Sequence, residues 1–149
     1  MNISLEHVET EEQWDAYHTL RRTILFENRG QMGVYDANHP DDRLENHFPL
    51  VLRAEGKLVG VVRVDLDDDE NTAYFRRVAI AEDAQGKGLG TRLMQLAEHF
   101  ASGKGFSRFA ANVAKDAIPF YQKLGYNFVD EKNCYNEDNP LMFKELSGN

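Results

Sequence analysis

Cysteine is almost absent from this sequence of 149 residues, which contains Cys134 and no other. One thiol can form neither a disulfide within the chain nor a zinc site built from several cysteines. The five histidines show no spacing typical of metal ligands, so we expect no metal centre. A chain without paired cysteines fits a reducing compartment, and we expect a cytoplasmic protein.

Long apolar runs and basic residues are scarce as well. The sequence has no run of about 18 apolar residues, the length that a membrane-spanning helix needs. Its first residues, MNISLEHVETEEQW, lack the basic and apolar segments of a signal peptide. The 17 Lys and Arg against 25 Asp and Glu give a formal net charge of −8. We therefore expect no nucleic-acid or membrane partner, although a phosphorylated small molecule, which feels the local field, stays possible.

The residues that are present indicate one ordered domain over residues 1–149, with 42% hydrophobic and 28% charged residues. Alternating or β-branched apolar patterns predict strands, and apolar residues at helical spacing predict helices. A capping box at Thr10 and Gln13 begins a helix that should run to about Phe26. The predicted strands cover residues 3–5, 48–54, 57–66, 72–80, 106–113, 126–132 and 141–146, and two further helices cover 89–102, closed by Gly103, and 117–124. This alternation predicts a mixed α/β or α+β sheet.

Two stretches interrupt this regular pattern. Residues 27–47 are irregular and longer than a simple connection, so we expect them to serve a function. The acidic run at residues 65–70 reads as a solvated hairpin tip, or alternatively as a surface that attracts a cationic amine.

A glycine-rich turn follows the strand that ends in Val78-Ala79-Ile80, and it leads into a helix. Helix N-termini carry unpaired N–H groups and a positive dipole, so such a turn can cradle a phosphate. Lys87 and Arg92 are placed to add positive charge, as are Arg76 and Arg77. An ordinary structural turn remains an alternative.

The spacing within this turn separates three phosphate motifs. Gly88 follows Lys87 where a P-loop needs Ser or Thr, and Thr91 stands where a dinucleotide fingerprint needs glycine. The segment instead fits [QR]-x-x-G-x-[GA], with Gln85, Gly88 and Gly90 at the specified positions.

A second segment lies about twenty residues downstream, where Asn112 ends a strand and AIPFYQKLGY follows. The pair VAI…QGKGLGTRLM and N…FYQKLGY resembles the GNAT superfamily of acyl-CoA N-acyltransferases, most strongly over residues 73–128. The segment LRRTILFENRG and the loop after it look similar to small bacterial members of the ElaA/YjcF type.

The resemblance implies an α+β GNAT fold: one mixed, largely antiparallel sheet of six or seven strands with helices on both faces. It implies transfer of an acetyl group from acetyl-CoA, without a metal, to a primary amine by direct attack in a ternary complex. The resemblance also leaves a homodimer open, although no sequence feature fixes it. The rival is a catalytically silent GNAT-fold domain that binds acyl-CoA as a sensor or binds a protein partner.

The resemblance also assigns candidate site residues. Tyr121 matches the tyrosine that protonates the departing thiolate, and its ordinary pKa near 10 keeps it protonated at neutral pH. The alternative for Tyr121 is a core tyrosine. The resemblance further implies two splayed strands with a backbone N–H that polarises the thioester carbonyl. The cofactor-binding candidates are Val78, Ala79, Ile80, Gln85, Gly86, Lys87, Gly88, Leu89, Gly90, Thr91, Asn112 and Phe120.

A general base is missing from the place where some family members carry it, because the start of the fourth strand holds no carboxylate. Asp65, His39 and His47 are candidates, each with the alternative of a solvated surface residue. A water chain, or no dedicated base, is also open. Cys134, in a polar loop without a nearby histidine, reads as a bystander thiol rather than an acyl carrier.

Overall fold

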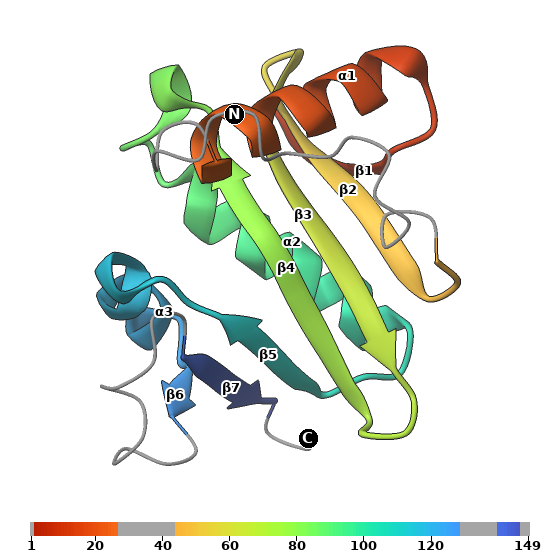
Figure 1. Cartoon of the computed structure of the whole chain (residues 1–149), viewed down its shortest axis with the longest axis vertical. Helices are drawn as coiled ribbons and strands as arrows, with labels where there is room; N and C mark the ends of the chain where they lie inside the picture. Colours follow the sequence, from red (N-terminus) through yellow and green to blue (C-terminus); the bar gives the residue numbers. More distant parts are fainter. Residues whose placement is uncertain (1, 27–43, 129–139, 147–149) are drawn as a thin grey trace.

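A seven-stranded sheet forms the centre of the molecule, in the strand order β1-β2-β3-β4-β5-β7-β6 (Figure 1). The structure is a computed structural model that describes residues 2–26, 44–128 and 140–146. The strands are β1 (Ile3–His7), β2 (His47–Ala54), β3 (Lys57–Asp67), β4 (Thr72–Ile80), β5 (Arg108–Asn112), β6 (Asn127–Phe128) and β7 (Leu141–Glu145). Only β4 and β5 pair in parallel; the other neighbours are antiparallel.

Helices cover both faces of this sheet, with α1 on one side and α2 on the other (Figure 1). The helical elements are α1 (Glu11–Leu20), η1 (Arg21–Phe26), η4 (Glu82–Ala84), α2 (Leu89–Gly103), η5 (Lys115–Ala117) and α3 (Ile118–Lys123). The expected α+β fold, with a mixed and largely antiparallel sheet, is confirmed.

Strand alternation divides the buried residues between the two faces, as the period of two along a strand requires. Leu50, Leu52 and Val62 share one cluster with Leu93 and Met94 of α2. The neighbours of these strand residues point the other way: Val51 and Val61 pack with Tyr17 of α1. The face that carries α1 also carries one of the two cavities described below.

The first helix begins as its capping box predicts, since Thr10 accepts from the backbone N–H of Gln13 and the Gln13 side chain accepts from Thr10. It continues to Phe26, but residues Arg21–Phe26 form a π-helix. Apolar spacing reports which face is buried and does not separate i+4 from i+5 hydrogen bonding, so the sequence could not predict this wider turn.

The end of α2 differs from the expectation by two residues. Gly103 is the last helical residue, and Gly105 adopts the left-handed conformation, with a φ of 94°. Gly105 donates to the carbonyl of Ser102 and Phe106 donates to that of Ala101, which is the Schellman pattern. The motif requires glycine at this one position, so Gly103 is not the terminating residue.

The strands β4 and β5 pair over only part of their length. The register joins Thr72–Phe75 of β4 to Arg108–Ala111 of β5, while β4 continues to Ile80. Beyond Phe75 a bulge interrupts the β3–β4 ladder between the pairs Arg63↔Arg76 and Val61↔Ala79. The bulge and the end of pairing coincide, so the two strands separate at one point of the sheet.

Candidate active site

A cleft of about 1220 Å³ occupies the place where β4 and β5 separate. The second half of β4, the turn before α2, the residues after β5, and α3 line this β4–β5 cleft. Eleven of the twelve cofactor-binding candidates lie on its wall: Val78, Ala79, Ile80, Gln85, Gly86, Gly88, Leu89, Gly90, Thr91, Asn112 and Phe120. The twelfth, Lys87, is exposed and does not line it.

The glycine-rich turn has a backbone that only glycine adopts readily. Gly86 and Gly88 have φ values of 80° and 76°, and Gly88 is the N-cap of α2. No side chain caps this helix, and its first residues, 88–91, line the cleft, where the N–H groups of a helix N-terminus suit an anion. Gln85 stabilises the turn, because its Nε2 donates to the carbonyl of Ile80 at 2.9 Å.

Glycine at position 90 serves a different purpose, because the Phe120 ring lies very close to this position. A Cβ atom there would lie 3.3 Å from Cζ of Phe120, tighter than an ordinary contact. The glycine therefore lets Phe120 of α3 pack against the first turn of α2 at the cleft wall.

The four cations expected to add positive charge near the turn lie at different places in the structure. Arg77 lines the cleft, but Lys87 and Arg92 do not, and Arg76 faces a second cavity described below. The Arg92 side chain donates to Gln95 along the helix at 3.2 Å. Lys115, which the sequence analysis did not select, also lines the cleft. Among the described residues, Arg77 and Lys115 are thus the two cationic side chains that line this cleft.

Tyr121 lies on α3 and faces the cleft with 6% of its surface exposed. Its ring meets those of Phe120 and Tyr126 edge-on, at centroid distances of 5.3 and 5.5 Å. Burial raises its pKa to about 12, so the phenol keeps its proton throughout the physiological range. A proton donor at the cleft wall is the chemical group that a departing thiolate needs.

Next to Tyr121, the side chains of Tyr126, Glu98 and Lys144 form a largely buried hydrogen-bonded cluster. The Tyr126 hydroxyl donates to Glu98 of α2 at 2.8 Å, and Lys144 of β7 donates to the other oxygen of Glu98 at 2.8 Å. Burial, followed by the nearby Glu98 charge, raises the pKa of Tyr126. The backbone N–H of Tyr126 donates to the carbonyl of Tyr121 at 3.0 Å, so this cluster fixes the end of α3.

The bulge in β4 places a strained residue on the cleft wall. Arg77 has a φ of 57°, which is uncommon for a residue with a side chain and costs on the order of 1–3 kcal/mol. Two residues, Arg77 and Val78, face one residue of β3 there, so their peptide groups leave the regular ladder. Both residues line the cleft, so the bulge lies on its wall.

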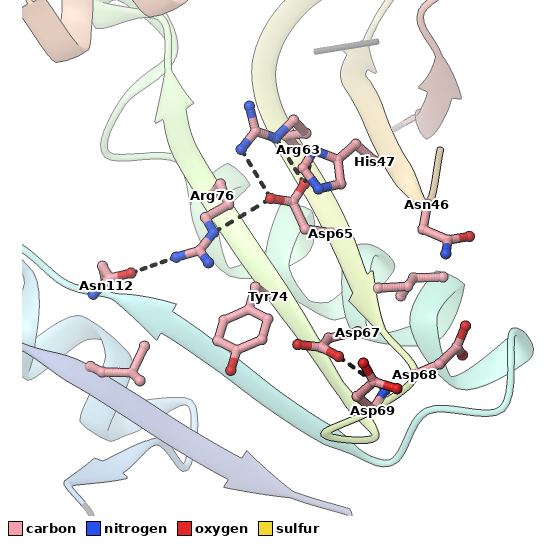
Figure 2. A pocket seen from close by; sticks show the side chains of 12 residues that line it. Asn46, His47, Arg63, Asp65, Asp67, Asp68, Asp69, Tyr74, Arg76 and Asn112 are labelled. Atoms are coloured by element: carbon pink, nitrogen blue, oxygen red, sulfur yellow. Dashed lines mark hydrogen bonds and ion pairs between the residues drawn. The ribbon is translucent and has the colours of Figure 1, made fainter. Parts of the chain in front are cut away.

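A second cavity, of about 770 Å³, lies on the face of the sheet that carries α1. We call it the front cavity; it is lined by Asn46, His47, Arg63, Asp65, Leu66, Asp67, Asp68, Asp69, Tyr74, Arg76, Asn112 and Leu141. Figure 2 shows a chain of polar contacts along it, from Arg63 through Asp65 and Arg76 to Asn112. Asn112 lines both cavities, so they meet at the end of β5.

Of the three base candidates, Asp65 is buried and paired on both oxygens. Arg63 donates to its Oδ1 and Oδ2 at 2.8 and 2.9 Å, and Nε of Arg76 lies 3.5 Å from Oδ2. A carboxylate held by two guanidiniums suits a structural counter-ion better than a proton acceptor. The expectation that it belongs to a solvated hairpin tip is wrong for Asp65, whereas Asp68 and Asp69 are exposed.

Of the other two candidates for the general base, His47 lies among the described residues and His39 does not. His47 lines the front cavity, with Nδ1 3.5 Å from Oδ1 of Asp65. It lies on β2, two strands away from β4, so about 10 Å of sheet separates it from β4, and the β4–β5 boundary lies farther still. His39 and Cys134 lie outside the described residues.

Within the described part of the chain, no three His, Cys, Asp or Glu residues are grouped so that they could hold a metal ion. No described helix is long and apolar enough to cross a membrane.

Sequence reasoning missed the contacts between strands. Neither the Arg76–Asn112 hydrogen bond nor the Asp65–Arg76 pair joins residues close in the chain. Ile24 also lines the cleft, from the π-helical turn whose width the sequence does not report. Only the pairing register of β3, β4 and β5 shows that Asp65, Arg76 and Asn112 lie close together.

Comparisons with known proteins agree on one family. The model of the acetyltransferase (GNAT) family matches residues 10–126. The uncharacterized N-acetyltransferase YjcF of Bacillus subtilis is 32% identical over 109 residues, which cover 70% of this chain and 76% of YjcF. A spermine/spermidine N(1)-acetyltransferase of the same organism is 31% identical over 118 residues, or 71% of this chain and 76% of that protein.

A solved structure shows the same fold. The PaiA N-acetyltransferase of Thermoplasma acidophilum, in complex with coenzyme A, superposes with a TM-score of 0.72 at 17% identity, over 98% of this chain and 100% of that one. The family match spans most of the chain, from α1 to the end of α3, and includes both the glycine-rich turn and Tyr121. This chain therefore belongs to the GNAT family of N-acetyltransferases.

Proposed function

We propose that the protein transfers an acetyl group from acetyl-CoA to a primary amine, with the thioester in the β4–β5 cleft. The observation that carries the proposal is the meeting of three features on one cleft wall: the glycine-rich helix N-terminus, the β4 bulge and the buried Tyr121. Coenzyme A in the PaiA structure, which has the same fold, supports this choice of donor.

In this arrangement the pyrophosphate lies at the turn of residues 85–91, where the N–H groups of α2 begin. The pantetheine arm runs along the free edge of β4 beyond Phe75, since β5 does not pair there. The thioester then reaches the bulge at Arg77 and Val78, close to Tyr121 and Asn112 on the same wall.

The chemistry follows from these positions. A neutral amine attacks the thioester carbonyl carbon, forming the C–N bond, and backbone N–H groups of the bulge stabilise the oxyanion. The C–S bond then breaks, and the Tyr121 hydroxyl gives its proton to the departing sulfur. The nitrogen loses its proton to water, and water restores the Tyr121 proton.

The amine enters through the front cavity in this proposal, because that cavity meets the β4–β5 cleft at Asn112. Asp68 and Asp69 are exposed at its outer end, in the β3–β4 turn. Thr72 pairs with Asp67 beside this turn. It lies four residues before Arg76 on β4, so the turn and Arg76 are about 13 Å apart along the strand. A cationic amine with a second ammonium group fits this spacing, and the polyamine named in one relative makes spermidine the first acceptor to test.

The test is acetyl-CoA-dependent thiol release with a panel of spermidine, spermine, monoamines, amino acids and lysine peptides, with product mass as the second readout. We expect release that depends on an amine in the panel. Release no faster than hydrolysis with every amine, despite tight acetyl-CoA binding, would favour the silent acyl-CoA-binding alternative.

A separate variant tests the acceptor side. The pair Asp68→Asn and Asp69→Asn removes two exposed charges at the outer end of the front cavity. We expect a higher KM for spermidine, by about three- to tenfold, and an unchanged KM for a monoamine. An equal change for both amines would contradict a second-ammonium site at this turn.

A further inference from the structure

We propose that Arg76 is a positioning residue that turns the Asn112 side-chain amide so that its N–H groups, and not its oxygen, serve the β4–β5 cleft. The proposal rests on the proposed function, because it uses Asn112 as a ligand of the pantetheine arm. It assigns Arg76 a role through Asn112 and not through direct contact with the cofactor.

The two residues stand where the sheet opens. Pairing between β4 and β5 ends at Phe75 and Ala111, and Arg76 and Asn112 are the next residue of each strand. Nη1 of Arg76 donates to Oδ1 of Asn112 at 2.6 Å. A side-chain hydrogen bond thus joins the strands at the first position where the backbone ladder no longer does, between the front cavity and the cleft (Figure 2).

The chemistry of arginine settles which way the amide faces. A guanidinium has donors and no acceptor, so the Asn112 atom that it contacts has to be the oxygen. The amide nitrogen then occupies the opposite branch of the side chain. A pantetheine arm presents amide carbonyl oxygens as well as amide N–H groups. With its oxygen taken by Arg76, Asn112 offers the arm its N–H groups, which bind the carbonyl oxygens.

Arg76 is itself held from two further sides. Its Nε lies 3.5 Å from Oδ2 of Asp65, and its Cζ lies 4.6 Å from the centre of the Tyr74 ring. Asp65 is 7% exposed and is clamped by the two hydrogen bonds from Arg63. The orientation of Asn112 is therefore determined by a connected series of groups that begins in the buried part of β3.

The test is a double-mutant cycle with coenzyme A binding, measured by calorimetry, in the wild type, Arg76→Met, Asn112→Ala and the double variant. We expect each single variant to bind about tenfold more weakly, as the loss of one hydrogen bond implies. The double variant should lie within about twofold of Asn112→Ala, because Arg76 has nothing left to orient.

Two further variants separate orientation from charge. Arg76→Lys keeps a donor for Oδ1, so we expect it to recover most of the affinity that Arg76→Met loses. Asn112→Asp keeps an oxygen for Arg76 but has no N–H group, so it should bind as weakly as Asn112→Ala. Arg53→Met removes an ion-paired guanidinium of β2 that lines neither cavity, and it should leave the affinity unchanged.

The experiment distinguishes a failure of this inference from a failure of the proposed function. If the wild type binds coenzyme A and the two single effects multiply in the double variant, Arg76 acts independently of Asn112 and the inference is overturned. The same holds if Arg53→Met weakens binding as much as Arg76→Met. If the wild type itself binds no coenzyme A, the proposed function fails and the inference fails with it. Melting curves of each variant identify any that does not fold.

Discussion

At the scale of single residues, burial and contact partners decide which chemistry each side chain offers. Tyr121 and Asp65 are both buried, but with opposite results. Burial among aromatic rings raises the pKa of Tyr121 to about 12 and keeps its proton in place, while Asp65 has both oxygens occupied by Arg63. The first is suited to give a proton, and the second to hold other groups still.

Tyr121→Phe tests the acid role directly. We expect kcat to fall on the order of 100-fold, with the dissociation constant of acetyl-CoA changed less than about threefold, since the ring remains in place. Because the phenol pKa is about 12, the wild-type kcat should show no falling limb below about pH 11. Thiol release across pH 6–10.5 measures both, and an unchanged kcat in the variant would remove Tyr121 from the acid role.

Contacts between single residues that are far apart in the chain could not be predicted from the sequence. Tyr121 and Asn112 stand in local motifs and were identified from them, and the structure brings both to one cleft. Arg76 belongs to no motif, and its partners Asp65 and Asn112 lie 11 and 36 positions away. Such pairs depend on strand register, which a sequence pattern leaves undetermined.

At the scale of elements, the strand boundaries followed from alternation and turn residues, and β4 was predicted over the residues it occupies. The bulge inside β4 was not predicted, because it arises where β3 and β4 pair and leaves no signature in β4 itself. Its consequence is functional: it turns the peptide groups of Arg77 and Val78 out of the ladder, beside the cleft.

The bulge can be tested at Arg77, whose φ is 57°. Arg77→Gly accepts this conformation, so we expect kcat to stay within about threefold of wild type. Arg77→Val disfavours it and should lower kcat by more than about tenfold while destabilising the fold by about 1–2 kcal/mol.

Glu55→Val is the matched control, because Glu55 has a φ of 50° in the β2–β3 turn, outside both cavities. It should destabilise the protein similarly and leave kcat unchanged. Equal kcat in Arg77→Val and Arg77→Gly would mean that the bulge has no part in catalysis.

At the scale of the whole molecule, two buried tyrosines tie stability to alkaline pH. Burial raises the pKa of Tyr121 to about 12 and that of Tyr126 further, whereas tyrosines of an unfolded chain ionise near pH 10. Above pH 10 the unfolded chain therefore loses phenol protons that the folded chain keeps. Their stabilising contribution is complete below about pH 10 and is lost as pH rises.

The free energy of unfolding should accordingly fall between pH 10 and 11.5, by roughly 1.4 kcal/mol per pH unit for each tyrosine. Urea unfolding of the wild type and Tyr121→Phe at several pH values measures this slope. The variant should show the shallower decline. Parallel declines would show that Tyr121 ionises equally easily in both states.

The central claim is that the glycine-rich turn and the β4–β5 cleft bind the acyl-CoA donor. The most direct measurement is calorimetric titration of acetyl-CoA into the wild type, Gly88→Glu and Gly56→Glu. Both glycines have positive φ, 76° and 83°, and open space at the Cβ position, but only Gly88 lines the cleft. The two variants therefore carry the same charge and a similar backbone strain.

We predict one acetyl-CoA per wild-type chain, affinity within about twofold in Gly56→Glu, and a loss of at least about 100-fold in Gly88→Glu, where a carboxylate meets the phosphates. Equal binding by Gly88→Glu and Gly56→Glu, or no binding by the wild type at millimolar acetyl-CoA, would contradict the account.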